Sequence, residues 1–307
     1  MIVCNGNILK LQVTKIGHFS GHADSIYALA VRRADQRFYS GSADGMVVQW
    51  DHVKKGDGIL VMKALSSVYS LLILNSGKKL LAGTSKGQLH LADIESNVEL
   101  KLIDAHQGGI FDLQSVGEFV YSCGEDGFVA KWDGEMGLIS RWQVSKKSVR
   151  VIRSFPETNL LICGCSDHSI KILDKESGKI IQTLDAHTNS VFSLCLTSKY
   201  LFSGGRDANI YQWDIKTIEL IKQIPAHTLH VNYLDYNIGN KLMLSCSMDK
   251  TIKIWDAETM ELLKVIDHRR NESHINCVNK VLWIDAKHFI SCGDDRAVMM
   301  FEISMSE

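Results

Sequence analysis

Serine, histidine and aspartate recur together in this sequence, and these are the residue types of a hydrolytic triad, in which histidine activates a serine nucleophile. The first set is His22, Ser40 and Asp44, followed by Trp50. The set returns as His106/Ser122/Asp126/Trp132, His187/Ser203/Asp207/Trp213 and His227/Ser245/Asp249/Trp255, and with phenylalanine in the last position as His274/Ser291/Asp295/Phe301. An enzyme needs one active site, whereas these five sets stand at nearly equal intervals, and the sequence has no G-x-S-x-G turn. We therefore predict that the sets are structural and that the chain has no catalytic residues.

The sets belong to a repeat that runs along the chain. Each unit closes with an acidic residue after a mostly hydrophobic one, and successive acidic residues are 40 to 46 residues apart: Asp51, Asp93, Asp133, Asp174, Asp214, Asp256 and Glu302. Short apolar runs such as residues 26–31 and turn dipeptides such as Asp44-Gly45 predict strands joined by tight turns. Two units depart from the pattern. Unit two has Ala64, Ala82, Lys86 and Ala92 at the four positions, and unit four has Ser145 for the histidine and Leu173 for the tryptophan.

These spacings resemble those of the WD40-repeat family over nearly the whole chain. The resemblance implies an all-β fold: a seven-bladed β-propeller of four-stranded antiparallel blades, formed by a single domain over residues 1–307. It also implies that each complete set is a buried hydrogen-bonded tetrad, in which the aspartate accepts from the histidine and the serine bridges histidine and tryptophan. Unit seven has no strand after residues 301–303, so we expect residues 8–14 to complete the last blade and close the ring.

Composition limits the classes of protein to which the chain can belong. Its 34 Lys and Arg against 35 Asp and Glu give a net charge of −1, which argues against a dedicated nucleic-acid or anionic-membrane binder. No apolar run approaches the roughly 18 residues of a membrane span. Eight cysteines without a CxxC pair and no secretory pattern at the start favour free thiols in a reducing compartment, so we expect a cytoplasmic protein. No metal or cofactor is expected.

A partner site is expected on the face where the chain enters the innermost strand of each blade, which the WD40 resemblance implies is a common binding face. The residue after the β-branched start of each innermost strand is Tyr27, Tyr69, Phe111, Arg150, Phe192, Asn232 or Asn279. The residues before the turn aspartates add Glu125, Arg206, Met248 and Asp294. Aromatic and arginine side chains are enriched in binding hot spots. Alternatively, the aromatic side chains pack between neighbouring blades.

The sequence thus predicts a non-catalytic scaffold that binds a protein or peptide on the rim around a central channel, either alone or as a subunit of a larger complex. The alternative is a propeller-type metal-dependent hydrolase or lactonase with its site in the channel. That activity would need carboxylate or histidine side chains converging there, whereas the inner-strand positions identified above are mainly aromatic, amide or aliphatic. An RNA-associated module is disfavoured by the balanced charge.

Overall fold

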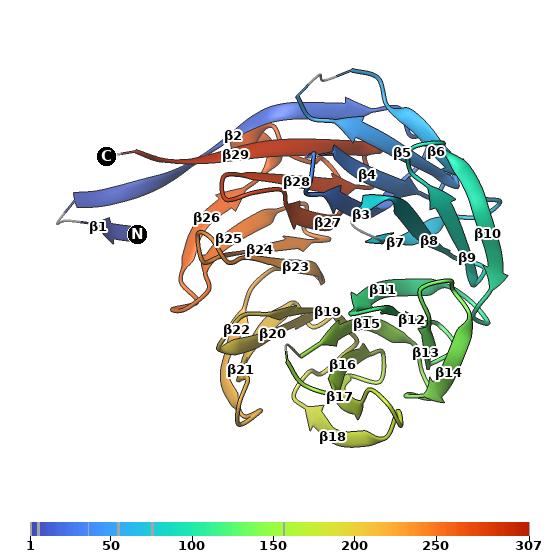
Figure 1. Ribbon diagram of the computed structural model, residues 1–307. Helices are drawn as coiled ribbons and strands as arrows, with labels where there is room; N and C mark the ends of the chain where they lie inside the picture. Colours follow the sequence, from blue (N-terminus) through green and yellow to red (C-terminus); the bar gives the residue numbers. More distant parts are fainter. Residues whose placement is uncertain are drawn as a thin grey trace.

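Seven antiparallel β-sheets surround a central axis in the computed structural model (Figure 1), which describes residues 2–4, 7–35, 37–53, 56–74, 77–155 and 157–306. The predicted seven-bladed, all-β architecture is confirmed. Each predicted unit supplies three strands of one blade. The segment after the unit supplies the fourth strand in blades 1 to 6, and the N-terminal segment supplies it in blade 7.

In blades 1 to 6 the strands run in sequence order from the channel outwards. Blade 1 contains β3 (Ile26–Arg32), β4 (Arg37–Ser42), β5 (Met46–Asp51) and β6 (Ile59–Lys63), and blade 2 contains β7 (Val68–Leu74), β8 (Lys79–Thr84), β9 (Gln88–Asp93) and β10 (Val98–Asp104). Blade 3 contains β11 (Ile110–Val116), β12 (Phe119–Gly124), β13 (Phe128–Trp132) and β14 (Leu138–Gln143), and blade 4 contains β15 (Val149–Ser154), β16 (Leu160–Cys165), β17 (Ser169–Asp174) and β18 (Ile180–Asp185).

The remaining blades complete the ring. Blade 5 contains β19 (Val191–Leu196), β20 (Tyr200–Gly205), β21 (Asn209–Asp214) and β22 (Leu220–Pro225), and blade 6 contains β23 (Val231–Asn237), β24 (Leu242–Ser247), β25 (Ile252–Asp256) and β26 (Leu262–Ile266). Blade 7 contains β27 (Val278–Trp283), β28 (His288–Gly293), β29 (Ala297–Ser306), β2 (Asn7–Ser20) and the short β1 (Ile2–Cys4). The only helix among the described residues is α1 (His268–Asn271), between blades 6 and 7, and no described helix is long and apolar enough to cross a membrane.

The core lies between the blades. The second strands are buried on both faces, as in β4 and β24, whereas outer strands such as β10 are largely exposed. Glycine in a second strand lets the next blade approach closely: a Cβ on Gly204 would lie 2.7 Å from the Val231 side chain. A β-branched residue starts all seven innermost strands. In four of them, Val68, Ile110, Val191 and Val231, its branched side chain fills the space above a glycine of the preceding blade.

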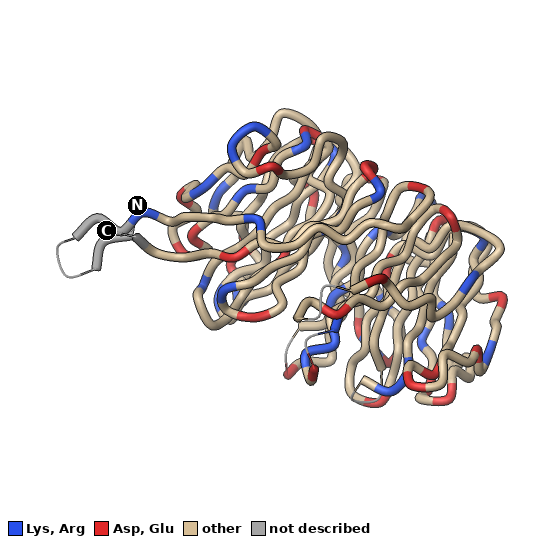
Figure 2. The backbone as a smooth tube through the Cα atoms, turned by 90° about the horizontal axis from the view of Figure 1, so that it is seen from above, with Lys and Arg blue, Asp and Glu red and all other residues tan. Residues whose placement is uncertain are grey.

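Strand β2 closes the ring, as predicted. It pairs antiparallel with β29, with Lys10 opposite Ser306 and Ser20 opposite Ala297. The strand is longer than the expected residues 8–14, because pairing continues through residue 20 after a register shift between Lys15 and Gly17. The first and last described segments therefore lie side by side (Figure 2). The same view shows basic and acidic residues interspersed along the loops, in keeping with the net charge of −1.

Candidate functional site

The serine, histidine and aspartate of each complete set form a buried chain of hydrogen bonds. In blade 5, Trp213 Nε1 donates to Ser203 Oγ at 3.0 Å, Ser203 Oγ lies 2.8 Å from His187 Nε2, and His187 Nδ1 lies 3.0 Å from Asp207. A carboxylate only accepts hydrogen bonds, so Nδ1 carries the histidine proton and Nε2 accepts from the serine. The side chain of Ser203 is fully buried, so it has no access to a substrate. It instead ties β20 and β21 to the loop that enters the blade before β19.

The same geometry recurs around the ring. It is present in blade 1 (His22, Ser40, Asp44, Trp50), blade 3 (His106, Ser122, Asp126, Trp132) and blade 6 (His227, Ser245, Asp249, Trp255). In blade 7, His274 bonds to Ser291 and Asp295, each at 2.8 Å, but Phe301 has no N–H to offer Ser291. Blade 7 therefore holds a shorter version of the same chain.

The tetrad aspartates are held in their charged form. Burial alone would raise the pKa of Asp126, but the hydrogen bonds it accepts from His106 and from the backbone N–H of Gln107 lower this pKa to about 2. The pKa values of the corresponding aspartates in blades 1, 5, 6 and 7 are also lowered. Burial would raise them, but their histidine partners and backbone N–H groups outweigh that effect. These carboxylates stay charged near neutral pH.

The two departing blades differ from each other. In blade 4, Ser145 Oγ donates to Asp167 at 2.8 Å and Lys171 Nζ donates to it at 3.0 Å. Lys171 was not identified from the sequence, although it stands at the position that Tyr211 occupies in blade 5, where the tyrosine hydroxyl bonds to the turn aspartate. In blade 2, Ala64, Ala82 and Ala92 lie in an apolar cluster. Blade 4 therefore has an ion pair between Asp167 and Lys171 in place of the tetrad, and blade 2 has apolar packing in its place.

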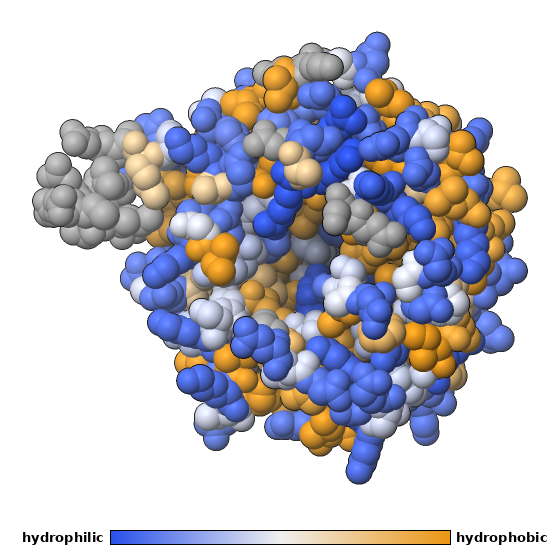
Figure 3. Space-filling view, in the orientation of Figure 1, coloured by the Kyte–Doolittle hydropathy of each residue, from blue (hydrophilic) through white to orange (hydrophobic). Residues whose placement is uncertain are grey.

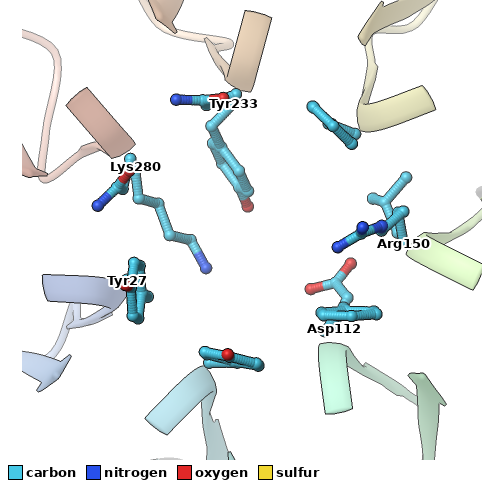
Figure 4. A pocket seen from close by; sticks show the side chains of 11 residues that line it. Tyr27, Asp112, Arg150, Tyr233 and Lys280 are labelled. Atoms are coloured by element: carbon cyan, nitrogen blue, oxygen red, sulfur yellow. The ribbon is translucent and has the colours of Figure 1, made fainter. Parts of the chain in front are cut away.

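One end of the central channel opens into a cavity of about 380 Å³, which we call the channel mouth (Figure 4). Its lining includes all seven predicted inner-strand residues, one from each blade: Tyr27, Tyr69, Phe111, Arg150, Phe192, Asn232 and Asn279. The four predicted turn residues lie outside this lining: Glu125, Arg206 and Met248 are exposed, and Asp294 accepts a hydrogen bond from Asn279 at 2.8 Å. A space-filling view shows the centre of the ring hollowed (Figure 3).

The aromatic side chains of the mouth both line the cavity and contact one another. The rings of Tyr27 and Tyr69 are 5.4 Å apart, and those of Tyr69 and Phe111 are stacked at 5.9 Å. The Arg150 guanidinium lies 4.1 Å from the centre of the Phe111 ring and 5.4 Å from that of Phe192. Blades 1 to 5 are thus joined side chain to side chain, as the packing alternative expects, while each of these residues keeps a partly exposed surface towards the cavity.

Charged residues deeper in the channel were missed by the sequence analysis. Asp112, Tyr233 and Lys280 also line the mouth, and Arg153 and Asp235 line a second cavity of about 460 Å³ further along the channel. The description of the inner strands as mainly aromatic, amide or aliphatic is therefore wrong for these positions. Each innermost strand has a β-bulge at its start, for example between Ile110 and Asp112, so two consecutive residues face the channel where simple alternation predicts one.

These charges form a network across the channel. Arg153 pairs with Asp112 and donates to the Tyr233 hydroxyl at 2.9 Å, which links blades 3, 4 and 6. Asp112 also accepts from the backbone N–H of Ile152 at 3.0 Å. Burial raises the pKa of Asp235 to about 6, although the backbone N–H of Trp283 and the charge of Arg153 oppose the shift.

Comparison with known proteins agrees with the repeat and the tetrads. The family model described as WD domain, G-beta repeat matches residues 13–51, 97–133, 178–214 and 218–256. The chain belongs to the WD40-repeat family. Human striatin is 24% identical over 217 residues, which are 69% of this chain and 24% of striatin. The WD repeat-containing protein 91 homolog of Dictyostelium discoideum is 27% identical over 215 residues, which are 65% of this chain and 27% of that protein.

A third relative comes from fission yeast. The U3 small nucleolar RNA-associated protein 21 homolog of Schizosaccharomyces pombe is 26% identical over 183 residues, which are 57% of this chain and 20% of that protein. The matched part of the chain thus spans about a quarter of the length of these curated relatives. Within the described part of this WD40 propeller, no group of three or more His, Cys, Asp or Glu side chains is arranged to hold a metal ion.

Proposed function

We propose that this WD40 propeller is a non-catalytic scaffold whose channel mouth binds an extended peptide segment of a partner protein. The observation that carries the proposal is the convergence of seven side chains, one from each blade, on a single open cavity of about 380 Å³. A cavity of this size accommodates a few side chains of a peptide and is too small for a folded domain. Binding through several blades would use the stiffness of the closed ring, because a preorganised site loses little entropy on binding.

The chemistry of the mouth suits a peptide. Aromatic walls offer contact area at low entropic cost. The amide N–H groups of Asn232 and Asn279 are used within the protein, so these side chains offer their oxygens as acceptors for peptide N–H groups. Both amides already bond to carbonyl oxygens of the next inner strand, at 2.9 Å from Asn232 to Val278 and 3.0 Å from Asn279 to Ile26. Their orientation is thereby fixed before a partner arrives.

We further propose that the 307 residues act as one domain, alone or within a larger complex, in a reducing compartment such as the cytoplasm. The seven cysteines whose side chains the structure describes are all unpaired, and six of them are buried. A chain from an oxidising compartment more often pairs its cysteines in disulfides. The relatives, which include striatin and an RNA-associated protein, are consistent with an assembly role.

The test compares partner capture by the wild-type protein and by Tyr27→Ala, Phe111→Ala and Arg150→Ala. Captured proteins are identified by mass spectrometry, with Arg270→Ala, an exposed arginine in α1, as the matched control. We expect the three variants to lose a protein that the wild type and the control retain, with nearly unchanged melting temperatures. If all three unfold several degrees earlier, the side chains are structural and the site is misplaced.

A further inference from the structure

The ammonium group of Lys280 lacks a negative partner. Its residue is 8% exposed, and within the described part of the chain its ammonium makes no hydrogen bond or ion pair; it lies 4.8 Å from the centre of the Tyr233 ring. The side chain reaches into the channel mouth rather than along the strand (Figure 4). The ammonium therefore faces the cavity without a counter-charge from the described residues, and this position can receive an anion.

A second cation lies across the mouth. The guanidinium of Arg150 is held against Phe111 and donates from Nε to Ser166 Oγ at 3.0 Å. Burial lowers the pKa of Arg150, and the charge of Glu125, which makes no ion pair with the guanidinium within the described part of the chain, opposes this shift. The aromatic contact and the Nε hydrogen bond fix the guanidinium plane, and the remaining N–H groups are left for a ligand.

The single carboxylate in the lining of the mouth is already occupied. Asp112 is paired with Arg153 and accepts the Ile152 backbone N–H. Its charge is therefore compensated from within the channel. Lys280 has no carboxylate partner among the described residues and Arg150 has only the more distant Glu125. The lining of the mouth therefore carries net positive charge, which disfavours a cationic anchor such as lysine.

We propose, on the basis of the function inferred above, that the channel mouth binds a peptide carboxylate between Lys280 and Arg150. The carboxylate is either an aspartate or glutamate side chain or the carboxyl terminus of the partner segment. A desolvated carboxylate between an ammonium and a guanidinium forms charge-assisted hydrogen bonds with both. The aromatic walls formed by Tyr27, Tyr69 and Phe192 pack against the aliphatic part of the anchor.

An apolar residue of the partner segment, next to its acidic anchor, could contact exposed apolar side chains beside the channel mouth. Leu229 and Met248 are 45% and 44% exposed, and the Met248 backbone N–H donates to the carbonyl of His230 at 3.2 Å. The His230 ring in turn lies 5.9 Å from Phe192 of the mouth. We therefore expect partner segments to combine an acidic anchor with a neighbouring aliphatic residue.

The experiment selects random dodecapeptides, displayed with free or amidated carboxyl termini, against the folded wild-type protein. Dissociation constants of the selected peptides are then measured for wild type, Lys280→Met, Lys280→Arg, Tyr27→Ala and Phe111→Ala. The control is Lys179→Met, which removes an exposed lysine before β18. Methionine keeps the length and apolar stem of Lys280, and thermal unfolding verifies the fold of each variant. For each peptide, the acidic residue is also replaced by its amide, and free and amidated termini are compared.

The expected result is enrichment of acidic peptides that lose about tenfold or more in affinity to Lys280→Met. The same peptides should lose comparable affinity when the carboxylate becomes an amide, and should bind Lys280→Arg and Lys179→Met nearly as well as wild type. The amide replacement that abolishes binding identifies the carboxylate as side chain or terminus.

Two other results separate the inference from the function on which it rests. Peptides that lack an acidic group, or whose affinity is insensitive to Lys280→Met, but that depend on Tyr27 and Phe111, would overturn the carboxylate anchor and leave peptide binding at the mouth intact. Selected peptides that depend on no residue of the mouth would overturn both.

Discussion

The blade-7 exception provides an internal control for the energetics of the tetrads. Ser203 in blade 5 and Ser291 in blade 7 are both fully buried and both bond to a histidine at 2.8 Å. Only Ser203 also accepts a tryptophan N–H, at 3.0 Å, because blade 7 has Phe301 at that position. Replacing each serine by alanine therefore removes the same hydroxyl from two sites that differ by one hydrogen bond.

The expected loss of folding stability follows from the number of buried polar groups that each substitution leaves without a hydrogen-bond partner. Ser203→Ala leaves two buried polar groups, the Trp213 N–H and His187 Nε2, without a hydrogen-bond partner. Each such group costs about 1–3 kcal/mol of folding stability. Ser291→Ala leaves only the Nε2 of His274 without a partner. We expect Ser203→Ala to lower the free energy of unfolding by about 1–3 kcal/mol more than Ser291→Ala does.

The assay is urea unfolding followed by tryptophan fluorescence and circular dichroism, with equal denaturant slopes required for the comparison. The exposed Ser198→Ala serves as a control. In a Trp213→Phe background, which reproduces the blade-7 arrangement, the effect of Ser203→Ala should shrink to that of Ser291→Ala. Equal losses for the two single serine variants, or no loss for either, would refute the assignment of the tetrads as stabilising hydrogen-bond chains.

Three further outcomes are expected. Removing residues 1–14 should lower the melting temperature of the whole ring in a single transition, because residues 10–14 pair with residues 302–306 of β29 and their loss leaves this edge of the last blade unpaired; an unchanged midpoint would contradict this. Asp112→Asn and Arg153→Met should each lower the free energy of unfolding by about 3–5 kcal/mol, and the double variant by less than the sum in chemical denaturation, since each single change leaves a buried charge unpaired. The pKa of Asp235 is raised to about 6, so the folded state binds this proton more tightly than the unfolded state and the resulting stability is lost as pH rises through 6. The stability gained by Asp235→Asn over wild type should therefore shrink between pH 7 and pH 5, and a pH-independent difference would show that Asp235 does not titrate there.

Much of the fold could be predicted because the determining pattern is local and repeated. The spacing of His187, Ser203, Asp207 and Trp213 recurs often enough to define the blades, and each copy folds into the same antiparallel strands. Closure by the N-terminal strand was also predictable, since the last unit lacks a partner for its final strand. The length of that strand was underestimated, because pairing continues past a register shift at Lys15 that no residue pattern marks.

The candidate site was predictable only in its outer layer. The seven residues that follow the β-branched starts converge on the mouth because ring closure brings equivalent positions of all blades together. Asp112, Tyr233 and Lys280 escaped prediction because a β-bulge places two consecutive residues on the channel side, against the alternation of a regular strand.

The sequence by itself therefore determined the number of blades, the tetrads and the ring of residues around the mouth, because each depends on contacts within one repeat or between neighbours of known order. The tertiary structure alone decided the electrostatics of the channel. Arg153 pairs with Asp112 across a blade boundary and leaves Lys280 without a counter-charge. Which charges are compensated depends on distances between residues far apart in the chain, and these distances exist only once the ring is closed.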